Sequence, residues 1–327
     1  MRISFRIEAT HFIYLVRRVQ MILISEFMDE AAVNLLKKKY DVYYDSSLVE
    51  DPNSLIKKIL KMKALIVRNK TLVTRELIEN APNLKCVGRL GVGLDNIDLN
   101  ACKEQNIAVY PALGANSHSV AEYVICTSML LLRKAYFKKN EMIAGNWPRQ
   151  ESSGSEVYGK TLGFIGFGDI ARKTRDLAIG LGINTVAYDP YLDKDSNVWK
   201  DTKNLDLDNL LSISDIISLH IPLTEETKNL LNENKLRLIK KSSVIINAAR
   251  GGVIDENQLA KLLKENKIAG AALDVFNNEP VNKEYAKKFK GIDNLILTPH
   301  VGGVTKESNK RVSELIAKKI DFHLSKK

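Results

Sequence analysis

The chain has 327 residues, which is enough for about two domains that each bury a substantial core. Hydrophobic residues make up 45% of it and charged residues 27%, so the composition excludes a low-complexity or disordered chain. The formal net charge is +10, but the lysines are spread along the sequence and do not gather with aromatic residues in one tract, so we predict no nucleic-acid partner. The longest apolar run, residues 124–132, is too short to cross a bilayer, so we also predict no membrane-spanning segment.

Two features bear on the location of the protein. Residues 1–20 hold four arginines and one glutamate, but their apolar stretch is short and lacks a small-residue cleavage site. We expect an upstream translation start or a poorly ordered tail there, in preference to a targeting signal. Cys86, Cys102 and Cys126 are far apart in apolar runs, so we expect buried reduced thiols, no zinc site and a cytoplasmic location.

Residues 21–113 alternate short apolar strands with amphipathic helices, which is the pattern of a parallel α/β domain. The expected strands are 21–25, 41–45, 64–69, 86–91 and 108–111, and the expected helices are 28–39, 52–62, 74–80 and 98–105. Ligands of such sheets bind beyond the carboxyl ends of the strands. Arg68 and Asn69 follow the third strand there, and the turn Gly91-Val92-Gly93 follows the fourth.

These strand-end residues are candidate substrate contacts. The Arg68 guanidinium could pair with a phosphate, sulfonate or carboxylate, and Arg89 could assist it. Backbone N–H groups of the Gly91–Gly93 turn could hold a carboxylate. An arginine without a ligand and a plain tight turn remain the alternatives that the residues alone leave open.

Residues 115–143 predict one long helix that links two domains. Ser119 is expected to cap this helix, and Glu122 is expected in its first turn. The expected apolar contacts are Val120, Val124, Met129 and Leu132. A helix that is apolar on several sides must be covered by both domains or by a partner subunit, and we expect a homodimer.

A strand, a glycine turn, a helix and a second strand follow in residues 160–190. The turn has the pattern G-x-G-x-x-A: Gly166 makes the tight turn, Gly168 lets the backbone approach a diphosphate, and Ala171 allows the helix to pack closely on the strand. Asp189 ends the second strand, where its carboxylate can accept both hydroxyls of an adenosine ribose and would repel a 2′-phosphate. The pattern therefore favours NAD, although flavin sites, adenosylmethionine sites and structural turns share the glycines.

Strands and helices continue to alternate up to His300, so the sequence predicts a second doubly wound domain around the glycine turn. A final helix, with Thr305 as its cap, has no strand of its own to cover, so we expect it to pack back on the first domain. Its expected apolar stripe is Val312, Leu315, Ile316 and Ile320. The predicted fold class is α/β, with a flavodoxin-like substrate domain (residues 21–114 and 302–327), a Rossmann-type NAD domain (residues 115–301) and a cleft between them.

Three charged or titratable residues lie at strand ends in the second half of the chain: Arg250, Glu279 and His300. A dehydrogenase acting on a 2-hydroxy acid needs an imidazole to accept the hydroxyl proton, a carboxylate to orient that imidazole and a guanidinium to hold the substrate carboxylate. Each residue also has a structural explanation, so spacing alone leaves the choice open. Among the other histidines, His220 could line the cofactor cleft, and His11, His118 and His323 are weaker candidates.

Several strings resemble successive signatures of the D-isomer-specific 2-hydroxyacid dehydrogenase family. They are LKCVGRLGVGLDNIDL, VYGKTLGFIGFGDIA, INAARGGVIDENQL, GAALDVFNNEP and LTPHVGG. The catalytic triad of that family, carried by its NxxRGG, DVFxxEP and TPHxGG segments, falls here on Arg250, Glu279 and His300. The departures are small: Ala171 replaces a glycine that is common in the family, and VGG follows His300 where the family often has GA.

The resemblance also implies the cofactor and the remaining contacts. It agrees with NAD as the cofactor and implies a small anionic 2-hydroxy or 2-oxo acid as the substrate. The scattered cysteines and histidines indicate no metal. Cofactor contacts are implied for Asp169, Ile170, Asp189, Ile221, Pro222, Ala248, Ala249, Asp274, Gly302 and Gly303, besides Gly166 and Gly168. Substrate contacts are implied for Arg68, Asn69, Gly91, Val92 and Gly93.

The choice of acid is harder to read from the sequence. The chain is similar to short phosphoglycerate dehydrogenases of that family, and its segment ISEFMDEAAVNLL is similar to sulfolactate dehydrogenases. Both substrates carry a second strong anion on the third carbon, which Arg68 could bind. Hydroxypyruvate or glyoxylate reduction is one alternative, and an NAD-sensing, corepressor-like binding protein is the alternative from another class.

Overall fold

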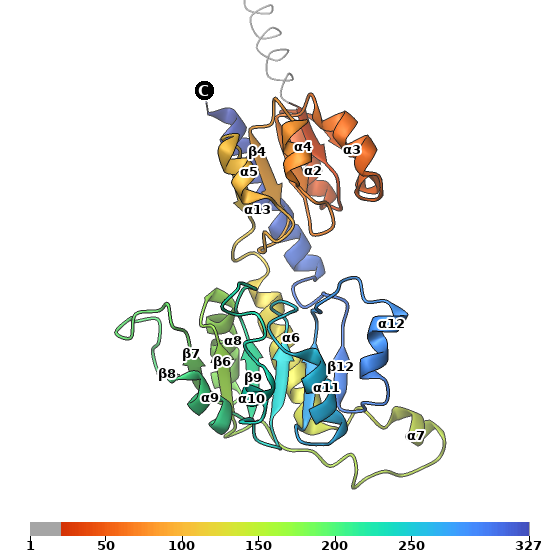
Figure 1. The fold of residues 1–327 in the computed structure, drawn as a ribbon, viewed down its shortest axis with the longest axis vertical. Coiled ribbons are helices and arrows are strands. Elements are labelled where there is room, and N and C mark those ends of the chain that lie inside the picture. The colour runs from red at the N-terminus through yellow and green to blue at the C-terminus, as the bar shows by residue number, and fades with distance from the viewer. Residues whose placement is uncertain (1–20, 327) are drawn as a thin grey trace, which may run out of the picture. The chain divides into compact units, whose positions relative to one another are not determined.

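The computed structural model describes residues 21–326, so the expectation for residues 1–20 lies outside the described part of the chain. The chain divides into two compact units, each with its own parallel sheet (Figure 1). Unit 1 comprises the residues up to Asn116 and those from Thr305 onward, and unit 2 comprises Ser117–Val304. The boundaries that we expected lie after residue 114 and before residue 302, and the assignment of substrate binding to unit 1 stays a prediction.

Unit 1 is built on a parallel sheet in the strand order β2-β1-β3-β4-β5. The strands are β1 (Met21–Ile24), β2 (Asp41–Tyr44), β3 (Ala64–Val67), β4 (Cys86–Arg89) and β5 (Ala108–Pro111). This is the flavodoxin-like order, and it reverses between β1 and β3. The loops after β1 and β3 are therefore the place where this sheet is expected to receive a ligand.

Helices cover both faces of this sheet because its strands point alternate apolar side chains to opposite faces. Ile22 and Ile24 pack with α2 (Glu30–Lys37) and α13 (Lys306–Ser325), whereas Leu23 packs on the other face. The helices of that second face are α3 (Pro52–Ile59), α4 (Arg75–Glu79) and α5 (Leu99–Glu104), with the 3-10 helix η1 (Ser46–Glu50) beside α3.

The last helix packs on unit 1, which confirms the prediction made for it. Thr305 caps α13: its side-chain oxygen accepts from the Ser308 N–H at 3.0 Å, and the Ser308 side chain accepts from the Thr305 N–H at 2.9 Å. Ile316 approaches β4 so closely that a Cβ atom on Gly88 would lie 2.6 Å from its side chain. Gly88 thus lets the carboxyl-terminal helix complete a core whose other elements come from the first 116 residues.

Unit 2 is built on a parallel sheet in the order β12-β11-β10-β9-β6-β7-β8. The strands are β6 (Thr161–Ile165), β7 (Asn184–Tyr188), β8 (Lys203–Asn204), β9 (Ile216–Leu219), β10 (Val244–Asn247), β11 (Gly270–Leu273) and β12 (Leu295–Leu297). This is the Rossmann order with one further strand, and it reverses between β6 and β9. Two parallel α/β units confirm the predicted fold class.

Helices also cover both faces of the second sheet. One face carries α6 (Ser117–Arg133) and α8 (Asp169–Gly180). The other carries α9 (Leu207–Ile213), α10 (Glu233–Leu236) and α11 (Glu256–Lys264). The prediction missed β8, α12 (Lys283–Ala286) and the 3-10 helix η2 (Lys287–Phe289), as it missed η1 in unit 1. These short segments carry mostly polar residues and therefore show no hydrophobic period.

The prediction of one helix over residues 115–143 is wrong. The first helix, α6, ends at Arg133, and Lys134 adopts a left-handed φ of 55° that an α-helix does not tolerate. A separate short helix, α7 (Lys139–Ile143), follows. The apolar pattern runs across this break because the chain beyond it is rich in aromatic residues, so composition hides the end of the helix.

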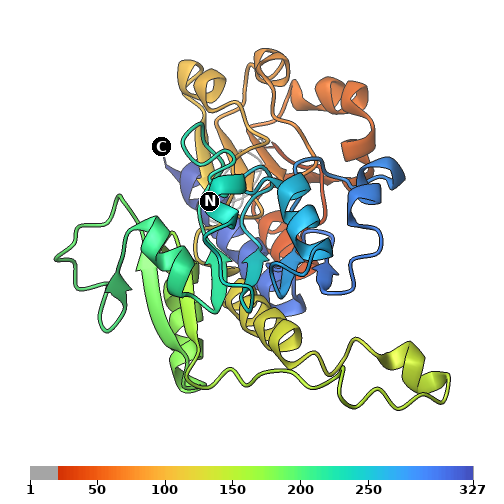
Figure 2. The same cartoon turned by 60° about the horizontal axis from the view of Figure 1, so that its bottom comes forward.

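Residues 134–153, called the arm below, leave the body of unit 2 and come back to the end of α6 (Figure 2). The Ser155 N–H donates to the Leu132 oxygen at 2.8 Å. A Cβ atom on Gly154 would lie 2.2 Å from the Arg133 oxygen, so a glycine is required where the chain returns. The arm is therefore a loop that leaves unit 2 after α6 and returns to the end of the same helix.

The start of α6 also differs from the prediction. The helix begins at Ser117, so Ser119 lies inside it and is buried instead of capping it, and Glu122 lies beyond the first turn. Val120, Val124 and Leu132 are buried as expected, but Met129 is 37% exposed.

The thiols follow the prediction only in part. All three cysteines are unpaired, and Cys86 and Cys102 are buried, where burial raises the pKa of their thiols to about 12 and about 11. Cys126 is exposed, so the expectation that it is buried is wrong. Within residues 21–326, no helix is long and apolar enough to cross a membrane.

Candidate active site

The glycine turn between β6 and α8 has the geometry that a dinucleotide diphosphate requires. Gly166 has a φ of 85°, and a Cβ atom there would lie 2.7 Å from the His220 oxygen and 2.6 Å from the Ile221 side chain. Gly168 is the N-cap of α8, and because it has no side chain, it cannot cap the first turn. The place where a Cβ atom would stand is open space. Gly168 thus leaves open space beside the start of α8, where the first N–H groups of the helix lack partners within the helix and are the groups that a phosphate would meet.

Asp189 directly follows β7 and links the glycine turn to the end of that strand. Its two carboxylate oxygens accept from the Phe167 N–H at 2.9 Å and from the Tyr191 N–H at 3.0 Å. Each oxygen keeps a second lone pair, so the carboxylate can still accept the two hydroxyls of an adenosine ribose. The residues present at this strand end fit NAD.

The other residues implied as cofactor contacts lie mainly after strands of the same sheet. Ile221 and Pro222 follow β9, Ala248 and Ala249 follow β10, and Asp274 follows β11. At the start of α8, Ile170 is half-buried and the Asp169 carboxylate pairs with Lys173 at 3.0 Å. Because the carboxyl ends of parallel strands meet along one side of a sheet, these residues share a side with the glycine turn. Their contact with the cofactor stays a prediction.

Glu279 and His300 form a direct pair. The Glu279 Oε2 atom lies 2.7 Å from His300 Nδ1, and the side chains are 31% and 39% exposed. Partial burial alone would raise the pKa of Glu279, but hydrogen bonds from His300 and from the Phe276 N–H, with the charges of His300 and Arg250, hold it below its ordinary value. An ionised carboxylate can only accept, so Nδ1 carries the proton and Nε2 is the basic nitrogen of the neutral ring.

Arg250 follows β10, and the buried Asn247 fixes the turn that carries it. The Asn247 side-chain N–H donates to the Arg250 oxygen at 2.9 Å, and its side-chain oxygen accepts from the Ala249 N–H at 3.1 Å. The positive charge of Arg250 is one of those that lower the pKa of Glu279. Unit 2 thus brings all three predicted catalytic residues to one region.

Asp274 holds the loop that carries His300. Its carboxylate accepts from the Thr298 hydroxyl at 2.6 Å, from the Val301 N–H at 2.8 Å and from the Gly302 N–H at 2.7 Å. His300 itself has a left-handed φ of 55°, and its backbone N–H donates to the main-chain oxygen of Asp274 at 2.8 Å. The structure therefore gives Asp274 a positioning role in addition to the cofactor contact predicted for it, which stays a prediction together with those of Gly302 and Gly303.

Three further supporting residues were missed by the sequence analysis. The Tyr123 hydroxyl on α6 lies 2.7 Å from the Thr298 hydroxyl, and burial raises the pKa of Tyr123 to about 12, so it remains a donor. Glu256, buried on α11, accepts from the Asn277 N–H at 2.7 Å and so fixes the loop before Glu279. For Thr298, as for Asn247, the available signal was a polar residue at the end of an apolar strand, in LILT and VIIN, whereas Tyr123 and Glu256 lie on helices and gave no such signal.

The predicted substrate contacts belong to unit 1. Arg68 follows β3, and its Nη2 donates to the Asn309 side-chain oxygen at 2.7 Å. Burial lowers the pKa of Arg68, although the negative charge of Glu26 acts in the opposite direction. Asn69 is exposed. The turn at Gly91, Val92 and Gly93 follows β4, and the Arg89 side chain lies against it, since a Cβ atom on Gly91 would be 1.4 Å from Arg89 Nη1.

The remaining histidines within residues 21–326 have other surroundings. His220 Nε2 bonds to the Ser218 hydroxyl at 2.8 Å, and burial lowers the pKa of His220 to about 3, so it stays neutral near pH 7. His323 Nδ1 bonds to the Tyr110 hydroxyl at 2.8 Å, and His118 is exposed on α6. The described residues contain no group of three or more His, Cys, Asp or Glu side chains that could hold a metal ion.

A Rossmann sheet, a glycine turn with the dinucleotide-binding pattern and a histidine–carboxylate pair are typical of nicotinamide-dependent dehydrogenases. Residues 125–302 match the family described as D-isomer specific 2-hydroxyacid dehydrogenase, NAD binding domain. The chain belongs to this family, and it is an NAD-dependent oxidoreductase of 2-hydroxy acids.

Similar proteins carry several substrate names. The chain is 47% identical over 293 residues to (S)-sulfolactate dehydrogenase of Chromohalobacter salexigens, which covers 89% of this chain and 94% of that protein. It is 38% identical to D-3-phosphoglycerate dehydrogenase of Methanocaldococcus jannaschii, covering 91% of this chain but only 56% of that longer protein. It is 37% identical to hydroxypyruvate reductase of Thermotoga maritima, and the match covers 91% of this chain and 96% of that protein.

Solved structures agree with this family. The chain superimposes with a TM-score of 0.80 and 27% identity on D-lactate dehydrogenase from Aquifex aeolicus complexed with NAD and lactic acid. The match covers 93% of this chain and 95% of that one.

Proposed function

We propose that the protein oxidises a 2-hydroxy acid that bears a second anionic group on its third carbon, with 3-sulfolactate favoured over 3-phosphoglycerate. The observation that carries this choice is the 47% identity to a sulfolactate dehydrogenase over 94% of its length, against 38% to a phosphoglycerate dehydrogenase of which this chain spans 56%. Arg68 supports it, because a guanidinium matches a sulfonate or phosphate group.

The stereochemistry of the favoured substrate is consistent with the family. In sulfolactate the sulfur-bearing carbon outranks the carboxylate, whereas in lactate the carboxylate outranks the methyl group. The priority order is therefore reversed, and the S label on sulfolactate describes the same spatial arrangement as the D isomer of lactate. An (S)-sulfolactate and a D-isomer-specific site are compatible for this reason.

We assign the catalytic steps to Arg250, Glu279 and His300. The Nε2 atom of His300 accepts the proton of the substrate hydroxyl, and Glu279 stabilises the imidazolium that this transfer forms. Arg250 binds the substrate carboxylate and polarises the developing carbonyl. When bound, NAD supplies the acceptor for the hydride released from the carbon that bears the hydroxyl.

A substrate comparison tests the proposed function. We expect NADH to form from (S)-sulfolactate with a kcat/KM at least about tenfold above that for 3-phosphoglycerate, and far above that for D-glycerate or D-lactate, because these two lack a second anion. A preference for hydroxypyruvate or glyoxylate in the reverse direction would favour the reductase alternative, which the Thermotoga relative supports. NAD binding without turnover of any acid would favour the corepressor-like alternative.

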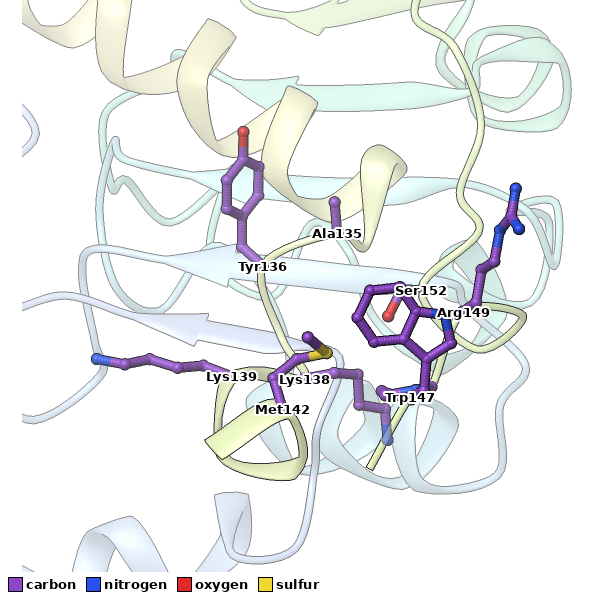
Figure 3. Close-up of a pocket in the computed structure, with 9 residues that line it drawn as sticks. Ala135, Tyr136, Lys138, Lys139, Met142, Trp147, Arg149 and Ser152 are labelled. Carbon is purple, nitrogen blue, oxygen red and sulfur yellow. The ribbon is translucent and has the colours of Figure 1, made fainter. Parts of the chain in front are cut away.

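We also propose that the protein is a homodimer in which the arm contacts a second copy. Large apolar side chains are exposed there: Tyr136 at 70%, Ile143 at 73% and Trp147 at 76%. A hollow of about 550 Å³ lies beside these side chains. Met142 of α7 and Trp147 of the returning segment are among the residues that line it (Figure 3). Exposed tryptophan, tyrosine and methionine beside a hollow are typical of a protein interface.

We also propose a cytoplasmic location. The unpaired thiols favour a reducing compartment such as the cytoplasm.

A further inference from the structure

Glu26 is a buried acid in the loop after β1 of unit 1. It is 5% exposed, and burial of a carboxylate is costly unless its oxygens are bonded. Its Oε1 accepts from the Arg68 N–H at 2.8 Å and from the Thr71 N–H at 2.9 Å, and its Oε2 accepts from the Lys70 N–H at 3.2 Å. One carboxylate therefore accepts from three of the four backbone N–H groups of residues 68–71, a segment called the Arg68 loop below.

The acceptors of the same loop are held from the other side. The Asn96 side-chain N–H group donates to the Arg68 oxygen at 3.1 Å and to the Thr71 oxygen at 2.7 Å. The Ser25 hydroxyl lies 3.0 Å from the Thr71 hydroxyl. The backbone of the Arg68 loop is thus fixed by side chains that follow β1 and β4, the strands that precede and follow β3 in the sheet order of unit 1.

The guanidinium of Arg68 has its own supports. Its Nη2 donates to Asn309 on α13, and its central carbon lies 6.0 Å from the centre of the Phe27 ring. An arginine keeps its charge under partial burial, so a cation with unused N–H groups is held in one orientation.

We propose that Glu26 is a positioning residue for the second anionic group of the substrate: it fixes the Arg68 loop so that Arg68 meets that group already oriented. This inference rests on the proposed function, in which Arg68 binds that anion. A preordered loop avoids the cost of ordering it at each binding event. A contact to a remote part of the substrate that is equally strong in the ground and transition states changes KM and leaves kcat unchanged.

The test compares variants by their steady-state constants with sulfolactate, or with phosphoglycerate if that is the acid turned over. In Glu26→Gln one oxygen becomes an NH2 group that cannot accept from the loop, so we expect KM for the acid to rise about tenfold. We expect kcat to stay within about twofold and KM for NAD to be unchanged. Asn96→Ala removes the side-chain donor to the Arg68 and Thr71 oxygens. It should likewise raise KM for the acid and leave kcat and KM for NAD unchanged.

Asp321→Asn is the matched control. It also replaces a carboxylate by an amide in unit 1, where Asp321 accepts from Lys39 at 2.7 Å and from the Tyr40 hydroxyl at 2.7 Å near the far end of α13. We expect this variant to leave KM for the acid unchanged. A rise like that of Glu26→Gln would show general damage to unit 1 and overturn the inference.

Arg68→Ala separates this inference from the proposed function. If Arg68→Ala alone leaves KM unchanged, the proposed anion contact is wrong. If it raises KM while Glu26→Gln and Asn96→Ala do not, only the inference about Glu26 is wrong. In the double variant Glu26→Gln/Arg68→Ala we expect no rise beyond that of Arg68→Ala, because Glu26 acts through Arg68, and an additive rise would contradict this.

Discussion

His300 depends on a chain of neighbours that hold it in an unusual backbone conformation. A left-handed φ in a non-glycine residue costs free energy and persists only where the surroundings fix it. Here Asp274 takes three hydrogen bonds from the loop, and Thr298 links Asp274 to Tyr123 on α6. The orientation of the imidazole therefore depends on Asp274, Thr298 and Tyr123 as well as on Glu279.

The lowered pKa of Glu279 makes a prediction about stability and pH. Because its folded-state pKa lies below the ordinary value, ionised Glu279 stabilises the fold above about pH 4, and this contribution is lost as the pH falls through the lower folded-state pKa. We expect Glu279→Gln to unfold in less urea than the unmodified protein near pH 7, and we expect this difference to shrink at about pH 3.

Glu284→Gln is the control for this measurement. Glu284 forms an exposed ion pair with Lys287 in the same segment, so its loss should change the free energy of unfolding by less than about 1 kcal/mol. A gap between Glu279→Gln and the unmodified protein that stays equally large at acid pH would show that the Glu279 charge is not its cause.

At the residue scale the sequence singled out the residues that we propose as catalytic, but it missed most of the residues that support them. Arg250, Glu279 and His300 drew attention because they follow apolar strands, but each also has a structural explanation, and the resemblance to the family motifs decided among the candidates. Asn247 and Thr298 also end apolar strands, but an amide or a hydroxyl in a turn is common. Tyr123 lies within an apolar helix, where nothing in the pattern distinguishes it from a packing residue.

The arm is the element that the sequence described least well. Its aromatic residues extend the apolar pattern of α6, and only the backbone at Lys134 and the close approach at Gly154 show that the chain leaves the body of unit 2. By contrast, α13 could be predicted in full, because Thr305 gives a clear cap and Val312, Ile316 and Ile320 give a clear stripe. A helix cap and an apolar stripe can be recognised from neighbouring residues, whereas the arm is defined by the point in the structure to which the chain returns.

The exposed side chains of the arm predict its role in assembly. We expect the double variant Ile143→Glu/Trp147→Glu to be monomeric in sedimentation equilibrium, because two charges in the proposed interface would remain unpaired. The unmodified protein should sediment at twice the mass of the chain.

Leu60→Glu serves as the control for the arm variant, since Leu60 is 46% exposed at the end of α3 and lies outside the arm. It should keep the mass of the unmodified protein. A dimer that survives both arm substitutions would contradict the proposed interface.

At the scale of the whole molecule, the residues of the proposed function are divided between the two units. Unit 2 carries the cofactor turn and the His300–Glu279 pair, and unit 1 carries the Arg68 loop. The sequence predicted two parallel α/β sheets because the strand and helix periods are strong in both halves. The split of unit 1 could be anticipated only from the last helix, which has an apolar stripe and no strand beside it.

The central claim is that this molecule transfers a hydride from a 2-hydroxy acid to NAD with His300 as the proton acceptor. The most direct test measures turnover and NAD affinity together in His300→Gln. We expect kcat for the preferred acid to fall by roughly 10² to 10⁴-fold while the Kd for NAD changes by less than about twofold, because the cofactor turn lies elsewhere on the sheet. A variant that keeps a near-normal kcat, with its NAD affinity intact, would contradict the account.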